Sequence, residues 1–350
     1  MDAKQKKWLW VSIGLSMVIL LAVLVLTFNE NTIESLKNLN PWFLLLAFCL
    51  HMAAMCVWAL RIRVMCGALG YLVPLRHCLN MVCAGQLIAS ITPSQVGGEP
   101  VRIHELYKAK MPVADATAVV LVERLMEAVL LVLGVIVGMG LFSIVYSNGE
   151  VPEMVITAAW IGTGFFVVLL AILAVLLSRP QLIRKIVFKI AGFFTKKWES
   201  ERIAKLTVQI DEAIDRLYLT FEMFAGRAKI GLVLGFLLTI VFWACEYAIA
   251  SVIMIGLGYP PNLLLSIVFQ LIIAVILMVP TTPGGAGVAE ISYAAFYSLI
   301  LPSAVVGVFV VLLRLILYYS NLLVGFIASF RIVKREAANE AVDLEEGGAV

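Results

Sequence analysis

Two short segments of this chain place charged side chains beside adjacent glycines, and they are the first candidates for chemistry. One reads Gly97-Gly98-Glu99 and is followed by Arg102, and the other reads Gly284-Gly285 and is followed by Glu290. Single ionisable residues also interrupt apolar stretches elsewhere: Glu123, Arg124, Glu127, Glu246 and Arg314. Arginines can hold a phosphate through charge-assisted bonds, whereas carboxylates can meet a cationic group or carry protons.

The composition indicates an integral membrane protein. Hydrophobic residues make up 62% of the 350 and charged residues only 14%, far from the balance of soluble domains. The formal net charge of +3 is too small to suggest a nucleic-acid partner. The six cysteines lie in or beside apolar segments without zinc spacing, so we predict small hydrophobic residues, no metal site and no cofactor.

The hydropathy pattern predicts an all-α fold with six transmembrane helices. Each candidate has about 20 or more largely apolar residues, as a spanning helix needs. The six are Trp8–Phe28, Pro41–Leu60, Ala116–Tyr146, Met154–Ser178, Ile230–Leu257 and Val305–Phe330.

Two further apolar regions are interrupted and do not fit a full span. The region from Cys78 to Tyr107 is broken at Pro93–Arg102, and that from Leu263 to Leu301 is broken at Pro280–Gly287. A helix over Cys78–Ile91 would be only about 21 Å long, against a hydrocarbon core of about 30 Å. Each region is therefore predicted to form a re-entrant helical hairpin.

Positive residues predict that both termini lie in the cytoplasm of a cell-membrane protein. The predicted inner segments carry most of the lysines and arginines, whereas residues 147–153 have none. The inner residues include Lys4, Lys6, Lys7, Arg61, Arg63, Arg76, Lys108, Lys110, Arg179, Arg184, Lys185, Arg331, Lys334 and Arg335.

These spans form one polytopic membrane domain over residues 1–335. An amphipathic cytoplasmic segment is expected at about 179–229, because apolar residues recur there at helical spacing. Residues 336–350 are polar and are expected to be a disordered tail.

The two interrupted regions also suggest an internal repeat. A shift of 187 residues superposes both breaks with four identities: Pro93 on Pro280, Gly97 on Gly284, Gly98 on Gly285 and Val101 on Val288. The predicted units, about 41–146 and 230–330, then have the same span–hairpin–span order in opposite orientation. Interrupted helices in corresponding places of inverted halves point to a mid-membrane binding site.

The breaks could place two helix N-termini near the middle of the membrane, where their amides would suit an anion such as a lipid phosphate. The alternative is an ordinary interfacial loop between short helices. We also expect Glu246 and Arg314 to face the interior, where they could pair with each other. The charged pairs could instead be buried ion pairs that only fix helix packing.

Taken together, these motifs resemble the lysylphosphatidylglycerol synthase transmembrane region, also called the flippase-like family. The resemblance rests on Pro93-x-x-x-Gly97-Gly98-Glu99-Pro100-x-Arg102, on Glu123-Arg124, and on Pro280-x-x-Pro283-Gly284-Gly285-x-Gly287-x-x-Glu290. It implies a membrane unit that moves a polar or aminoacylated lipid between leaflets. The synthase activity is not implied, because the longest soluble stretch has no room for that domain.

The leading hypothesis is therefore a lipid flippase or transporter that is not an enzyme. It would bind a lipid with an anionic, aminoacylated, glycosylated or polyprenyl-linked headgroup. The predicted binding residues are Gly97, Gly98, Glu99, Arg102, Glu123, Arg124, Glu246, Gly284, Gly285, Glu290 and Arg314. A transporter of a small solute or ion, or an intramembrane lipid-modifying enzyme, remains an alternative, although no hydrolase motif is present.

Overall fold

The computed structural model describes residues 30–92, 97–145, 200–278 and 284–347, with Thr282 and scattered positions within 14–25 and 157–185. These described parts contain helices and no strand, as the sequence predicts. Among the described residues, three helices are long and apolar enough to cross a membrane: Pro41–Ala68, Lys229–Gly256 and Ser303–Ala337. The predicted spans Trp8–Phe28 and Met154–Ser178 lie largely outside the described residues.

The first interrupted region is framed by two long helices. They are α3 (Pro41–Ala68) and α6 (Val113–Val145), and between them lie the shorter α4 (Leu75–Ile91) and α5 (Gly98–Lys108). The Asn40 side chain caps α3 by accepting from the Trp42 amide, and Pro41 fits the first turn, where no amide donor is needed. Helix α3 extends eight residues beyond the predicted Leu60, so Arg61 lies within it.

The second interrupted region has the same order of elements. Helix α10 (Lys229–Gly256) is followed by α11 (Leu263–Met278) and α12 (Val288–Tyr297). A long helix then consists of α13 (Ser303–Arg314), the π-helical turn η1 (Leu315–Tyr319) and α14 (Ser320–Gly347). Two further described helices are α2 (Glu30–Lys37) and α9 (Ser200–Ala225), the latter within the predicted amphipathic segment.

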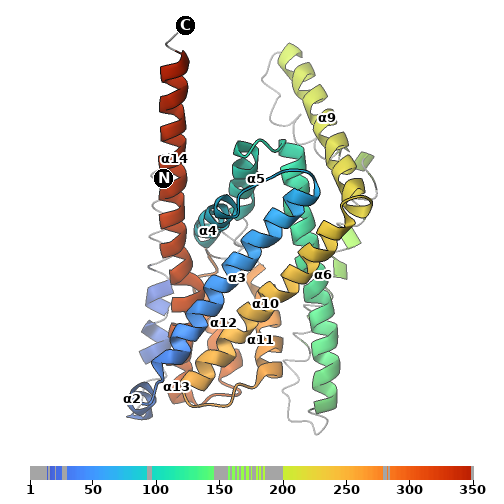
Figure 1. Ribbon diagram of the computed structural model, residues 1–350. Coiled ribbons are helices and arrows are strands. Elements are labelled where there is room, and N and C mark those ends of the chain that lie inside the picture. The colour runs from blue at the N-terminus through green and yellow to red at the C-terminus, as the bar shows by residue number, and fades with distance from the viewer. Residues whose placement is uncertain are drawn as a thin grey trace.

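The two regions pack into each other around α3 and α10, which lie side by side (Figure 1). Helix α4 packs on α14, and α11 packs on α6. The approach of α14 to α4 is close, since a Cβ on Gly325 would lie 2.6 Å from the Cys83 carbonyl oxygen. Apolar side chains such as Ile62, Met65 and Phe269 fill the space between these helices.

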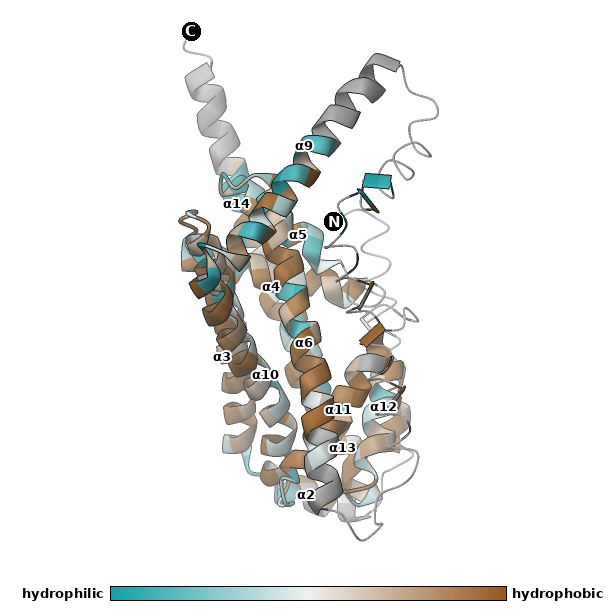
Figure 2. Cartoon of the chain, turned by 90° about the vertical axis from the view of Figure 1, so that its right-hand side faces the viewer, coloured by the Kyte–Doolittle hydropathy of each residue, from teal (hydrophilic) through white to brown (hydrophobic). Residues whose placement is uncertain are grey.

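The short helices of the two regions lie toward opposite ends of the bundle. Helices α4 and α5 lie toward the end that carries α9 and the C-terminal part of α14 (Figure 1). Helices α11 and α12 lie toward the other end, near α2. Figure 2 shows hydrophobic residues along α3, α6, α10 and α11, and hydrophilic residues gathered around α9 and the adjacent end of α14.

The C-terminal segment differs from the sequence-based expectation. Residues 336–347 were expected to be disordered, but α14 continues through them to Gly347. The reason is local: this stretch is rich in alanine and glutamate, which favour helix, and it extends a helix that is already formed. Residues 348–350 lie outside the described part.

Candidate functional site

The carboxylate of Glu123 lies at the centre of a buried ionic network. Arg102 of α5 contacts it at 2.9 Å, and Arg61 and the Trp58 indole nitrogen of α3 donate to its other oxygen. Arg61 also bonds Glu127 at 2.8 Å. Glu123 and Arg61 are fully buried, so the network joins α3, α5 and α6 away from water.

One side of this network is accessible. The Arg124 guanidinium lies 3.1 Å from Glu99 and 2.6 Å from Glu127, and its side chain is 38% exposed. Glu99 is 22% exposed and also contacts Arg102 at 3.3 Å. Its second oxygen, Oε2, has no hydrogen-bond partner within the described residues. Glu99 and Arg124 thus form a polar rim over a network that is buried behind them.

Charges in this network balance, because it contains three arginines and three glutamates. The Trp58 ring lies among the cations, with the guanidinium carbons of Arg102, Arg61 and Arg124 at 5.1, 5.7 and 5.9 Å from its centre. Cation–π attraction of this kind is worth about 2 kcal/mol where the groups are desolvated. Trp58 therefore partly offsets the repulsion between three neighbouring positive charges.

A second ionic contact lies beside the other break. Arg314, the last residue of α13, contacts Glu290 of α12 at 2.9 Å, and Ser16 donates to the same carboxylate oxygen at 2.5 Å. The Arg314 guanidinium also lies 4.2 Å from the ring centre of Tyr318. Glu290 is fully buried, so this pair is shielded from water.

The two breaks touch each other in the middle of the bundle. The Gly284 amide donates to the Thr92 carbonyl at 3.1 Å, and the Tyr318 hydroxyl donates to the Ser90 carbonyl at 3.4 Å. Gly284 has a φ of +60°, and a Cβ there would lie 2.2 Å from the Ser90 carbonyl oxygen. Glycine is needed both for this backbone conformation and for this close approach. Residues 93–96, 279–281 and Pro283 lie outside the described part.

One amide at the start of each of the helices that follow the breaks, α5 and α12, is bonded within the chain. The Gly287 amide donates to the Glu290 carboxylate at 2.6 Å, and the Gly97 amide donates to the Thr92 hydroxyl at 3.0 Å. Because a carboxylate already occupies the N-terminus of α12, the accessible rim of the first network is the better place for a ligand.

Glu246 and Arg314 have different partners, so they do not form the pair that the sequence suggested. Glu246 of α10 bonds Nδ1 of His51 at 2.8 Å, and Nε2 of the same ring lies 2.9 Å from Asn321 of α14. The His51 side chain is 1% exposed and that of Glu246 is 14% exposed. Both predicted residues do lie away from the outer surface, as expected.

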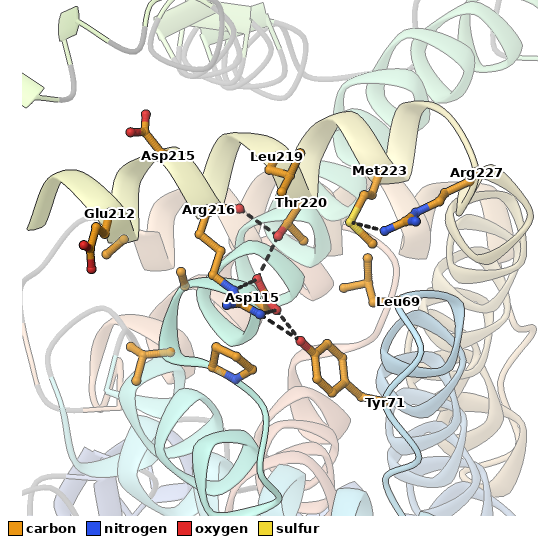
Figure 3. A pocket seen from close by; sticks show the side chains of 14 residues that line it. Leu69, Tyr71, Asp115, Glu212, Asp215, Arg216, Leu219, Thr220, Met223 and Arg227 are labelled. Carbon is orange, nitrogen blue, oxygen red and sulfur yellow. Dashed lines mark hydrogen bonds and ion pairs between the residues drawn. The ribbon is translucent and has the colours of Figure 1, made fainter. Parts of the chain in front are cut away.

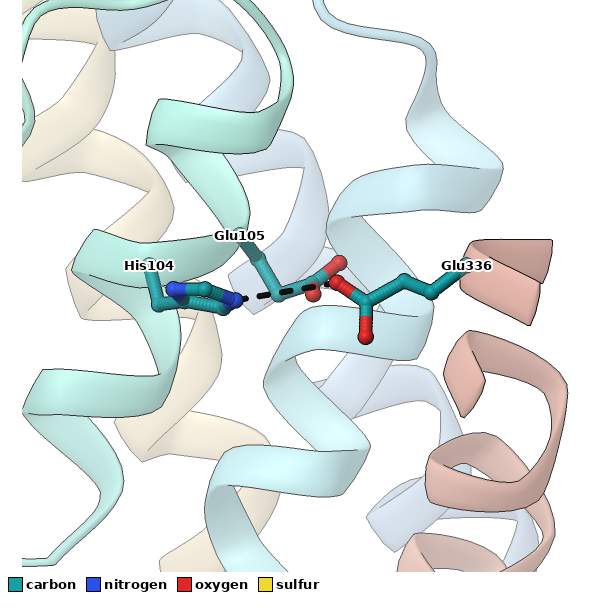
Figure 4. Close-up of side chains that lie close together, drawn as sticks. All are labelled: His104, Glu105 and Glu336. Carbon is teal, nitrogen blue, oxygen red and sulfur yellow. Dashed lines mark ion pairs between the residues drawn. The ribbon is translucent and has the colours of Figure 1, made fainter. Parts of the chain in front are cut away.

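Side chains at the α9 end of the bundle form a further group, which contains none of the predicted site residues. Within the described residues His104, Glu105 and Glu336 could reach a common ion (Figure 4). Glu105 is bonded by Arg335 at 2.8 Å, and Glu336 lies 3.6 Å from both Lys108 and His104. Both carboxylates therefore have cationic partners, and we interpret the group as an ion-pair contact between α5 and α14.

A cavity of about 1000 Å³ lies between α9, the start of α6 and the loop after α3. Arg216 forms two 3.0 Å bonds to Asp115, which also accepts from Tyr71 and Thr220 (Figure 3). Hydrogen bonding to Asp115 raises the pKa of Arg216, and burial raises the pKa of Tyr71. Both groups keep their protons at neutral pH and hold α9 to α6.

The structure brings most of the predicted site residues together, but in three places. Glu99, Arg102, Glu123 and Arg124 join the first network, and Gly97 and Gly98 form the start of α5 beside it. Glu290 and Arg314 form the second contact near Gly284 and Gly285. Glu246 belongs to the third, with His51.

Sequence analysis missed Arg61, Trp58, His51 and Asn321. Arg61 was assigned to a cytoplasmic loop because the predicted helix ended one residue before it. A signal was available, since Trp58 and Arg61 are three residues apart and share a helix face. His51 lies in the middle of the predicted span, where an ionisable group is unusual.

Comparison with known proteins gives consistent matches over nearly the whole chain. Residues 9–325 match the family described as lysylphosphatidylglycerol synthase TM region. A UPF0104 membrane protein of Archaeoglobus fulgidus is 30% identical over 333 residues, which cover 92% of this chain and 97% of the relative. A UPF0104 membrane protein of Methanocaldococcus jannaschii is 26% identical over 332 residues, 92% of this chain and 94% of the relative. No solved structure matches significantly.

Proposed function

Because the chain belongs to the lysylphosphatidylglycerol synthase TM region family, we propose that it moves a lipid with a polar headgroup between the two leaflets of the cell membrane. The observation that carries this proposal is the rim of Glu99 and Arg124 over a buried, charge-balanced network. Ionisable groups in apolar helices are costly, so a partly accessible cluster of them is a candidate binding site.

The rim suits the chemistry of a lipid headgroup. A phosphate could take the place of the Glu99 carboxylate as the partner of Arg124. The planar guanidinium suits the charge-assisted hydrogen bonds that a phosphate accepts. The Oε2 atom of Glu99 is buried without a partner among the described residues, and it could accept from an amine or a sugar hydroxyl once the rim opens. Acyl chains would stay in the bilayer, and no covalent step on the lipid is required.

The contacts between helices support an inverted repeat of six spans and two re-entrant hairpins. If α3, α4, α5 and α6 are exchanged with α10, α11, α12 and the α13–α14 helix, each contact maps onto another. The contact of α4 with α14 corresponds to that of α11 with α6, and α5 with α6 corresponds to α12 with α13. Such repeats place a binding site at the interface of the halves and permit alternating access.

This arrangement favours an orientation with α9 and both termini in the cytoplasm. Helices α4 and α5 would then enter from the cytoplasmic side, and α11 and α12 from the outside. Exposed basic residues at the α9 end, among them Arg63, Arg76 and Lys108, agree with the excess of positive charge found on cytoplasmic segments.

A leaflet-resolved assay in proteoliposomes tests the proposal. Purified protein should accelerate the movement of at least one labelled anionic, aminoacylated or glycosylated lipid over protein-free vesicles. Arg124→Gln should reduce that rate at least tenfold, because it removes the accessible guanidinium. Arg227→Gln is the matched control, since this exposed arginine at the end of α9 contacts only the Met223 sulfur among the described residues.

The proposal is wrong if no lipid of these classes moves while the reconstituted protein remains folded. Uptake of a water-soluble anion without lipid movement would instead favour a solute transporter. Equal loss of lipid movement in the Arg124 and Arg227 variants would remove the rim as the binding site.

A further inference from the structure

His51, Glu246 and Asn321 join three helices through hydrogen bonds that are separate from both arginine networks. The ring of His51 on α3 bonds Glu246 on α10 at 2.8 Å and lies 2.9 Å from Asn321 Oδ1 on α14. Among the described residues His51 is the basic group in ion-pair contact with Glu246. The contact thus connects the first helix of each repeat unit to the long C-terminal helix.

The hydrogen bonds determine how many protons the group holds. The Asn321 amide nitrogen donates to the Leu317 carbonyl at 2.8 Å, so its oxygen is the atom that faces His51. That oxygen can only accept, and Nε2 of His51 must therefore carry a proton. Nδ1 faces a carboxylate oxygen, and two bare acceptors repel at 2.8 Å, so a second proton lies between them.

We propose that His51 and Glu246 form a proton-binding site that releases one proton to water and rebinds it. With the proton bound, the pair is neutral, either as imidazolium and carboxylate or as imidazole and carboxylic acid. Release of this proton leaves the pair with a net charge of −1. The Nδ1 lone pair then faces the Glu246 carboxylate and the two repel, so the contact between His51 and Glu246 must open. Because the Glu246 side chain is 14% exposed and His51 is 1% exposed, we expect the proton to leave on the Glu246 side.

The position of Asn321 connects this site to the second break. Asn321 follows the π-helical turn η1, and Arg314, the partner of Glu290, directly precedes that turn. Such π-helical turns are frequent at functional sites, where their hydrogen bonds can rearrange. Opening the His51 contact would free the α14 side of the turn, and so would affect the helix that holds Arg314.

Other titratable groups near the pair come from the neighbouring elements. Cys245 and Tyr247 flank Glu246 on α10, and Tyr293 of α12 is within electrostatic reach of it. Glu127 of α6 is within reach of Tyr247, and Arg314 and Glu290 are within reach of Tyr293. A measured change in protonation can therefore be attributed to His51 or Glu246 only if a substitution of that residue removes it.

Proton binding can be measured without any transport assay. The chain has three histidines, so the ring-nitrogen signals of isotope-labelled protein in nanodiscs are few. The signals that disappear in His51→Gln belong to His51. At neutral pH we expect either two protonated ring nitrogens or a protonated-carboxyl infrared band that Glu246→Gln removes. A neutral His51 beside an ionised Glu246 at every pH at which the protein stays folded would overturn the proposal, and so would a protonated pair that never changes with pH. Asn321→Gln keeps a neutral amide acceptor and should preserve the signal, whereas Asn321→Leu removes the acceptor and should shift it.

A second experiment tests whether the proton drives transport, and this part rests on the proposed function. In proteoliposomes a pH gradient should increase wild-type lipid movement several-fold, and His51→Gln should lose that increase. His104→Gln is the matched control, because this histidine is 57% exposed at the α9 end and should keep the increase.

The two failures are distinguishable. If wild-type protein moves no lipid, the proposed function fails while the protonation result stands. If lipid moves with equal rates with and without the gradient, or if His51→Gln keeps the increase, proton coupling fails while the flippase proposal stands.

Discussion

At the residue scale, Arg61 explains how Glu123 and Glu127 can be buried together. Two carboxylates four residues apart on α6 lie on one face and repel each other. The Arg61 guanidinium contacts both, and its Nη1 donates to the Thr239 hydroxyl of α10 at 3.1 Å. A single buried cation thus holds α3, α6 and α10 together while it neutralises part of the acidic charge.

Arg61→Met should destabilise the protein by about 3–5 kcal/mol, because it takes from two buried carboxylates one of the cations that neutralise them. Denaturant unfolding in detergent micelles measures the effect. Arg63→Met, two residues further along α3 and exposed, is the control and should change stability by less than about 0.5 kcal/mol. Adding Glu123→Gln to Arg61→Met should recover part of the loss. Similar stability of the Arg61 and Arg63 variants would contradict the buried network.

At the element scale, the breaks in the short helices are where the two regions meet. A continuous helix satisfies its own backbone groups, but a broken one leaves amides and carbonyls that need other partners. Here the partners are close by: Thr92 accepts from Gly284, Ser90 accepts from Tyr318, and Glu290 caps its own helix at Gly287. The interruptions therefore satisfy each other within the apolar bundle.

Gly284→Ala tests whether the close approach of the two breaks stabilises the protein, beyond the backbone strain that any residue with a positive φ would add. Gly258 also has a positive φ, +84°, but a Cβ there meets nothing within 4 Å. Gly258→Ala should cost only the backbone strain of about 1–2 kcal/mol. Gly284→Ala should cost clearly more, because its Cβ would overlap the Ser90 carbonyl. Thermal unfolding of both variants measures the difference, and equal losses would mean that the breaks do not need to touch.

At the scale of the whole molecule, the polar side chains gather at several separate places in the bundle. The α5–α14 ion pairs lie at the α9 end, the two arginine networks lie beside the breaks, and the His51 contact links α3, α10 and α14. Helix α14 takes part in two of these groups. Its Arg335 bonds Glu105 at the α9 end, and its Asn321 bonds His51. A movement of this helix against α4 would therefore change several polar contacts together.

The proposed orientation gives a direct prediction for single-cysteine labelling. With the six native cysteines replaced, Arg227→Cys at the α9–α10 turn should react only when an impermeant reagent reaches the cytoplasmic side. Pro260→Cys, in the turn between α10 and α11, should react from outside intact cells. Labelling of both positions from the same side would contradict α10 as a spanning helix.

The sequence by itself determined the class of the fold and the places of its interruptions. Long apolar runs form helices in a bilayer because their backbone groups must bond internally, so α6 and α10 lie within a few residues of their predicted bounds. The charged residues beside the breaks could also be picked out, because few charges occur in such stretches, and the structure places Arg102 and Glu290 in different contacts.

Only the tertiary structure decided which charge meets which. Pairing depends on how helices distant in the sequence are rotated and placed against each other, and one chain's hydropathy does not contain that information. Arg61 therefore seemed to be a loop residue until α3 proved long enough to carry it to Glu123. The sequence suggested Arg314 as the partner of Glu246, but the packing of α3 against α10 and η1 places His51 next to it instead.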